Sequence, residues 1–201
     1  MIINDRSGVE ADFGIHECKI PETGDARDWE SCQTLSGSWG WDPLQPVGRN
    51  SDDVIRMLCT TVGRGGNLLL NVGPDDEGVV HEEEVAILRR LGKWMERFGT
   101  AIRGSRVAVL PAGQAPAPDC HVVSTGTDLH VLWTGERGAD VMVSGLHLNP
   151  GSRVELPEYA GSVPWRQGPD GNSVLLVSQV PAAAWADEPA IALRLVGAQV
   201  R

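Results

Sequence analysis

The hydrophobic pattern of the first hundred residues alternates between strands and helices. Ile2 and Ile3 form a short apolar run that leads directly into Asn4, Asp5 and Arg6. Such a run, ending in polar and ionisable residues, predicts a strand that delivers side chains to the mouth of a site. A loop rich in glycine, proline and acidic residues is expected from residue 7 to about residue 28.

The next segments predict a strand and two helices. Residues 29–39 indicate a half-buried strand that continues into a polar loop. A helix is expected from Ser51, a candidate N-cap, up to the glycines that begin at Gly63. A stronger helix is expected over residues 81–98, since acidic residues begin it, basic residues lie toward its end and a glycine follows. The apolar stripe of this second helix consists of Val85, Leu88, Leu91, Trp94, Met95 and Phe98.

Between these helices lies "NLLLNVGP", a continuous apolar run typical of a strand buried on both faces of a parallel sheet. Asn71, near its far end, is expected to tie down neighbouring loops. Strand, helix, strand and helix with short links predict βα units. Because so few units cannot cover both faces of a sheet, we expect further protein before Met1.

The pattern changes after Ser105. Residues 107–201 contain short alternating runs such as "CHVVST" and "AIALRLV", separated by glycine, proline, asparagine and aspartate. No stretch of any length has the helical period, which indicates an antiparallel β-sandwich. The predicted fold class is therefore α/β followed by all-β, with domains at residues 1–105 and 106–201.

Composition narrows the range of partners. The chain has 201 residues, a formal net charge of −10 and a pI near 4.9, which argues against nucleic acid and anionic membrane surfaces as partners. No apolar run is long enough for a transmembrane helix. The four cysteines form no CxxC pair, so a structural zinc site is not expected, and Cys59 fits a buried free thiol. The compartment cannot be predicted.

Arg6 and Glu17 form the first candidate site, with Asp5 and His16 beside them. An arginine at the carboxyl end of a strand can hold a ligand hydroxyl or carboxylate, and a nearby glutamate can transfer protons. The structural alternative is a plain ion pair between Asp5 and Arg6, with Glu17 exposed in a loop.

A second candidate is "SGSWGW", in which Trp39 and Trp41 flank a glycine after a predicted strand. Exposed tryptophans in such loops indicate carbohydrate binding, because aromatic faces stack on the apolar faces of sugars. The alternative is that both side chains are part of the core.

The glycine-rich stretch over residues 63–78 matches no nucleotide-binding template. Its glycines precede a strand, whereas a Walker loop follows a strand and a Rossmann loop opens a helix. The acidic residues at 75–77 do not have EF-hand spacing. We interpret this stretch as scaffold.

Four motifs in this order resemble the α-L-fucosidases of glycoside hydrolase family 29. They are "NDR", "WESCQTLSGSWGW", "GRGGNLLLNVGPDDEG" and "LGKWMERFGTAIRGS", and the resemblance covers about residues 2–106. It implies the end of an incomplete (β/α)8-like barrel followed by a C-terminal β-sandwich. It also implies a retaining exo-glycosidase that removes terminal α-linked L-fucose from glycans through a covalent intermediate, with no metal or organic cofactor.

Carried over residue by residue, the resemblance assigns three roles. Arg6 matches the arginine of the NDR motif, which contacts the sugar, and Glu17 matches the acid/base glutamate. Trp39 matches the aromatic residue that lies against the C6 methyl group of fucose. Ser7 stands where the family commonly has an aromatic residue. The family's nucleophilic aspartate lies well upstream of NDR, so this chain is expected to lack it and to be inactive alone.

Two other functions remain open from the sequence. One is a non-catalytic carbohydrate-binding module that uses the β-sandwich and the loop of Trp39 and Trp41. The other is a structural fragment with no affinity for sugars. The oligomeric state and the preferred fucosyl linkage cannot be predicted.

Overall fold

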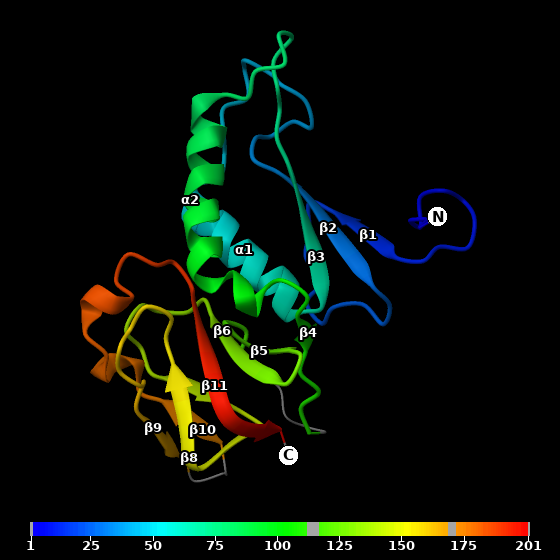
Figure 1. The fold of residues 1–201 in the computed structure, drawn as a ribbon. Helices are drawn as coiled ribbons and strands as arrows, with labels where there is room; N and C mark the ends of the chain where they lie inside the picture. Colours follow the sequence, from blue (N-terminus) through cyan, green and yellow to red (C-terminus); the bar gives the residue numbers. More distant parts are fainter. Residues whose placement is uncertain (1, 112–116, 169–171, 201) are drawn as a thin grey trace. The chain divides into compact units, whose positions relative to one another are not determined.

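The computed structural model describes residues 2–111, 117–168 and 172–200 and contains two compact units, Met1–Lys93 and Trp94–Arg201 (Figure 1). The division falls inside the second helix. The domain limits predicted from the sequence, 1–105 and 106–201, stay a prediction.

The first unit contains a three-stranded parallel sheet in the order β1-β2-β3. Its strands are β1 (Gly14–Glu17), β2 (Trp29–Thr34) and β3 (Gly66–Asn71). Helix α1 (Ser51–Gly63) connects β2 to β3, and α2 (Glu82–Phe98) follows β3. Parallel strands joined through a helix confirm the α/β character predicted for this part of the chain.

The first strand lies where the sequence predicted a loop. Ile2 and Ile3 belong to no strand, and the neighbouring Asn4 forms only an isolated parallel bridge with Phe13. Strand β1 begins at Gly14, which pairs with Trp29 of β2. The prediction was wrong because β1 is four residues long, with a single aliphatic residue, and depends on its partner strand for its hydrogen bonds.

The core of this unit lies between the sheet and the helices. Leu35, Val54, Met57 and Ile87 are buried there, and half-buried Leu68 and Leu70 pack against them. The stripe predicted for α2 is displaced by one position near its start: Ile87 is buried, whereas Leu88 is 36% exposed. A register error of one residue is easily made where apolar residues are adjacent, as in "AILRRL".

Strand β3 is not buried on both faces. Leu69 is 42% exposed, on the side opposite Leu68 and Leu70, since neighbouring side chains of a strand point to opposite faces. Within the described residues β3 pairs only with β2. The prediction that this strand is buried on both faces is therefore wrong for the face that carries Leu69.

Helix α1 begins as the sequence predicted, but its cap is a different residue. The side chain of Asn50 accepts a hydrogen bond from the backbone N–H of Asp53 at 2.9 Å, and Asn50 has an extended backbone. Ser51 is the first helical residue. Asparagine and serine are both good N-caps, so local sequence alone does not choose between these adjacent positions.

The second unit contains two antiparallel sheets, which confirms the pairing predicted for this part of the chain. The five-stranded sheet has the order β4 (Arg106–Val107), β5 (Cys120–Thr125), β6 (Asp128–Trp133), β11 (Ile191–Val200) and β8 (Leu146–Glu155). The three-stranded sheet has the order β7 (Val141–Val143), β10 (Ser173–Leu175) and β9 (Trp165–Gln167). The described residues of this unit also include the short 3-10 helices η1 (Gly99–Ala101), η2 (Val177–Gln179) and η3 (Ala182–Ala184).

The end of α2 belongs to this second unit. Trp94 is fully buried, and its indole N–H donates to the backbone oxygen of Ala190 at 2.8 Å. The rings of Trp94 and Phe98 lie 5.2 Å apart, and Phe98 is also fully buried. Both side chains were predicted to be buried, and this is confirmed.

We predict that Asn50→Ala lowers the free energy of unfolding of the chain by about 1 kcal/mol, because it removes the side-chain acceptor at the start of α1. Thermal unfolding followed by circular dichroism measures the change. Ser51→Ala is the matched control and should leave the melting temperature nearly unchanged. An equal loss in both variants would contradict the assignment of the cap.

The four thiols are free and should react at very different rates with Ellman's reagent. Cys18 is exposed and should react first, and half-buried Cys32 more slowly. Burial raises the pKa of Cys59, and raises the pKa of Cys120 to about 12, so both stay protonated and covered. These two should react only in denaturant. Four fast-reacting thiols in the native protein would contradict the described core.

Candidate active site

The structure brings Arg6 and Glu17 together. A guanidinium nitrogen of Arg6 lies 2.6 Å from a carboxylate oxygen of Glu17, the last residue of β1. Hydrogen bonding to the Glu17 carboxylate raises the pKa of Arg6. The two side chains are 53% and 41% exposed, and ion pairs in such surroundings contribute little to stability. Solvent and ligands can therefore reach both groups, and the pair can be exchanged for other partners.

Asp5 does not pair with Arg6, in contrast to the structural alternative considered for this segment. One of its carboxylate oxygens lies 2.7 Å from Arg27, and the other accepts the backbone N–H of Ile15 at 3.1 Å. Asp5 thus fastens the N-terminal segment to β1. Arg6, the next residue, is left to pair with Glu17.

His16 has a structural place beside this pair. Its ring meets Trp29 edge-on, with centroids 5.5 Å apart, and its Nε2 atom lies 3.4 Å from Asp25. Desolvation acts to raise the pKa of Asp25, but hydrogen bonds from the Ala26 and Arg27 backbone and from His16 lower it. His16 packs within the sheet and is not joined to Arg6 or Glu17 by these contacts.

Trp39 and Trp41 are not core residues. Each is 43% exposed, so the alternative of two buried indoles is wrong. The side-chain amide of Asn71 donates to the backbone oxygen of Trp39 at 2.7 Å, which confirms the predicted role of Asn71 in tying down a loop. The Trp41 ring stacks on His81 with centroids 5.6 Å apart and planes 11° from parallel.

Gly73 and Glu84 also shape this edge, and sequence reasoning missed their roles. A Cβ atom on Gly73 would lie 3.1 Å from the backbone nitrogen of Trp41, so any other residue would move the two loops apart by a few tenths of an ångström. The Gly73 N–H lies 3.2 Å from a carboxylate oxygen of Glu84, which is only 4% exposed. The sequence shows Glu84 as one of three consecutive glutamates, with no signal that it is buried.

Parallel pairing explains why these groups share one edge of the sheet. The carboxyl ends of parallel strands lie at the same edge of a sheet. Glu17 and Asn71 are the last residues of β1 and β3, and the loop of Trp39 follows β2, so all three lie at this edge. A cavity of about 460 Å³ opens between the two loops that follow β2 and β3, and Trp41, His81 and Glu84 are among its lining residues. The contacts join Arg6 to Glu17 and Trp39 to Asn71; they do not join Trp39 to the ion pair.

Among residues 2–111, 117–168 and 172–200, no group of three or more His, Cys, Asp or Glu side chains is arranged to hold a metal ion. The helices in these ranges are too short or too polar to cross a lipid bilayer.

Comparison with known proteins gives one consistent family. The family model described as Alpha-L-fucosidase matches residues 1–100. Tissue alpha-L-fucosidase of Bos taurus is 29% identical over 210 residues, which cover 98% of this chain and 44% of the relative. The Alpha-L-fucosidase of Dictyostelium discoideum is 34% identical over 113 residues, which cover 52% of this chain and 24% of the relative.

Solved structures show the same fold. The Thermotoga maritima alpha-fucosidase in complex with a mechanism-based inhibitor aligns with a TM-score of 0.77 at 24% identity, over 97% of this chain and 45% of its own. Alpha-L-fucosidase isoenzyme 1 from Paenibacillus thiaminolyticus aligns with a TM-score of 0.76 at 22% identity, over 92% of this chain and 45% of its own.

The chain spans a little under half the length of tissue alpha-L-fucosidase of Bos taurus and of these two solved fucosidases. The order of the motifs, the match of the family model and the shared fold all agree, and the chain belongs to the α-L-fucosidase family.

Proposed function

We propose that this chain is the C-terminal part of a retaining α-L-fucosidase, which hydrolyses terminal α-L-fucosyl residues of glycans. The observation that carries the proposal is the pair of Arg6 and Glu17 at the carboxyl edge of a parallel sheet, in a chain of this family. The fucose complex of the Thermotoga maritima enzyme supports the choice of substrate.

In this proposal β1, β2 and β3 are the last strands of a (β/α)8-like barrel. The parallel order of the strands supports it, as does the exposed Leu69, which would face further protein in a closed barrel. The β-sandwich then follows as the C-terminal domain, with the limits at residues 1–105 and 106–201.

Glu17 acts first as the acid and then as the base. In a retaining enzyme one carboxyl group protonates the departing glycosidic oxygen while a second carboxylate attacks the anomeric carbon. The first group then removes a proton from the water that hydrolyses the intermediate. Glu17 suits this role because it lies at the end of its strand, 41% exposed, where a leaving group and water can reach it.

Arg6 holds the sugar beside Glu17. Its guanidinium has several donors and, among the residues that the structure describes, a single ion pair, with Glu17, so it can also donate to a sugar hydroxyl. Trp39 lies in the next loop and presents an exposed ring that suits the C6 methyl group of fucose. Asn71 keeps this loop in place through the Trp39 backbone oxygen.

The nucleophile belongs to a part of the protein outside this chain. A retaining mechanism needs two carboxyl groups about 5–5.5 Å apart. Asp5 belongs to the NDR motif itself, and its contacts with Arg27 and the Ile15 N–H give it a part in fastening this segment. The chain alone is therefore inactive in this proposal.

A second candidate function is carbohydrate binding without catalysis. The exposed rings of Trp39 and Trp41 favour it, since a sugar can stack on them whether or not a nucleophile is present. Both functions require that the protein binds a sugar, but only the first requires that the full-length enzyme hydrolyses it.

We predict that the purified chain does not hydrolyse p-nitrophenyl α-L-fucoside above the buffer rate, because in this proposal another part of the protein carries the carboxylate that forms the covalent intermediate. Release of p-nitrophenolate is measured over hours. Turnover at the rate of a full-length relative would refute the assignment of the nucleophile to another part of the protein. Fucose titration followed by tryptophan fluorescence tests binding in the same samples, and a response lost in Trp39→Ala supports the sugar site.

In the full-length enzyme that carries this chain, Glu17→Gln should lower kcat by about 10²- to 10⁴-fold on a fucosylated oligosaccharide. The loss should be smaller on p-nitrophenyl α-L-fucoside, whose leaving group needs no proton. Glu10→Gln is the matched control, since Glu10 is an exposed glutamate of the same segment, and it should leave kcat unchanged. An equal loss on both substrates would indicate a different role for Glu17.

A further inference from the structure

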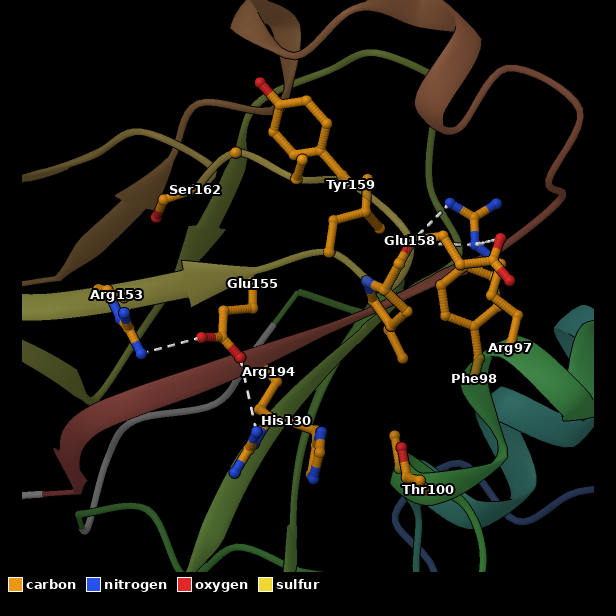
Figure 2. Close-up of a pocket in the computed structure, with 16 residues that line it drawn as sticks. Arg97, Phe98, Thr100, His130, Arg153, Glu155, Glu158, Tyr159, Ser162 and Arg194 are labelled. Carbon is orange, nitrogen blue, oxygen red and sulfur yellow. Dashed lines mark hydrogen bonds and ion pairs between the residues drawn. The ribbon is translucent and has the colours of Figure 1, made fainter.

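A separate cavity of about 560 Å³ lies in the unit Trp94–Arg201. Figure 2 shows side chains from several elements around it: Phe98 and Thr100 from the end of α2 and η1, His130 from β6, Glu155 from β8 and Arg194 from β11. Its volume lies in the range of small-molecule sites. No motif of the sequence pointed to it, because its lining is assembled from four separate segments of the chain.

The charged groups of this cavity are paired with one another. Glu155 lies 3.2 Å from Arg153 and 3.5 Å from Arg194 (Figure 2). Arg194 is also 2.9 Å from Asp128. These pairs leave both groups accessible to a ligand, since the side chains of Glu155 and Arg194 are 36% and 47% exposed. The pairs also cancel most of the charge, so the cavity does not attract an ion of either sign strongly.

Arg97 closes the opposite side of the cavity. Its guanidinium lies 3.3 Å from Glu158 and 3.3 Å from Glu188, and it donates to the backbone oxygen of Pro157 at 3.0 Å. Its charge is thus compensated as well, and its contacts fasten the segment that follows β8.

That segment is built in a strained conformation. Glu158 has a φ of 66°, in the left-handed region that residues other than glycine rarely adopt. A Cβ atom on Gly161 would lie 2.6 Å from the Tyr159 ring, so the ring lies directly against this glycine. Strained backbone of this kind is found preferentially where a loop must hold a ligand.

His130 adds neutral hydrogen-bonding capacity. It is 4% exposed, and burial, aided by the charge of Arg194, lowers its pKa. A neutral imidazole has one donor and one acceptor, and within the described part of the chain the ring makes no hydrogen bond. Thr100 contributes an exposed hydroxyl group to the same cavity.

We propose that this cavity is a second, non-catalytic binding site that takes a neutral mono- or disaccharide. The carboxylate of Glu155 and the guanidinium of Arg194 bind sugar hydroxyls, the His130 ring and Thr100 hydroxyl bind a further one, and half-buried Tyr159 offers apolar contact to C–H groups. An apolar ligand would leave these polar groups unpaired, and an anion would meet Glu155. The site does not depend on the fucosidase proposal, since it lies wholly in the unit Trp94–Arg201.

The test is a titration of the ¹⁵N-labelled full chain with N-acetyllactosamine, methyl α-L-fucoside and sodium sulfate, each to about 20 mM, followed by amide NMR shifts. We expect saturable shifts at His130 and in residues 157–162 with at least one saccharide, and none with sulfate. Shifts near Arg6 and Glu17 report on the proposed catalytic site in the same spectra, so the two proposals fail or succeed separately.

Glu155→Gln should weaken saccharide binding at His130 by about tenfold, because it removes a charged acceptor. Thr100→Val keeps every ion pair and should weaken saccharide binding by about threefold. If Glu155→Gln fails to fold, Thr100→Val alone tests the proposal. Met142→Ala, at an exposed position of β7, is the control and should bind as the wild type does. The proposal is overturned by absence of saturable shifts at this cavity, by equal shifts with sulfate, or by wild-type binding in Thr100→Val and folded Glu155→Gln.

Discussion

The packing of Trp29 across Gly66 fixes the sheet on which the candidate active site depends. The two residues are register partners in β2 and β3, and a Cβ atom on Gly66 would lie 2.5 Å from the indole. On the other side of β2, His16 of β1 meets the same ring edge-on. One buried tryptophan therefore touches all three strands. Any larger residue at position 66 would force the ring away and loosen their alignment.

This alignment matters because side chains of a strand alternate between faces. A shift of one residue would move every side chain of β1 to the opposite face and separate Glu17 from Arg6. The same register places Asn71 where its amide reaches the loop of Trp39. The contacts that hold the scaffold are buried, whereas the ion pair of Arg6 and Glu17 is exposed. An exposed pair that contributes little to stability is suited to exchange its partners when a ligand arrives.

In the second unit, charged side chains form networks in place of a single ion pair. Around its cavity Arg97, Arg194 and Glu155 are held in networks with several partners each, so their positions depend on one another. These networks compensate the charges of their members, and only Arg97, at 14% exposed, is also largely covered. If the saccharide site proposed for this unit exists, the enzyme has a second point of attachment to a branched glycan, apart from its catalytic residues.

The sequence by itself determined the local elements. The helical period predicted α1 and α2, alternation predicted the antiparallel strands of the second unit, and the order of motifs indicated the family. The selection of Arg6, Glu17 and Trp39 also came from the sequence, and the exposure of Trp39 confirms that it is not core. These features are local, because each depends on neighbours within a few residues.

Only the tertiary structure decided which residues meet. Strand β1 lies at Gly14–Glu17, Asp5 forms an ion pair with Arg27, and Glu84 is buried beside Gly73. The tertiary structure also assembled the cavity around His130 and Glu155. Each of these outcomes joins segments that are far apart in the chain or that lack any apolar period. A linear pattern contains no information on such pairings, because strand pairing and side-chain packing select among alternatives that are equal in the local sequence.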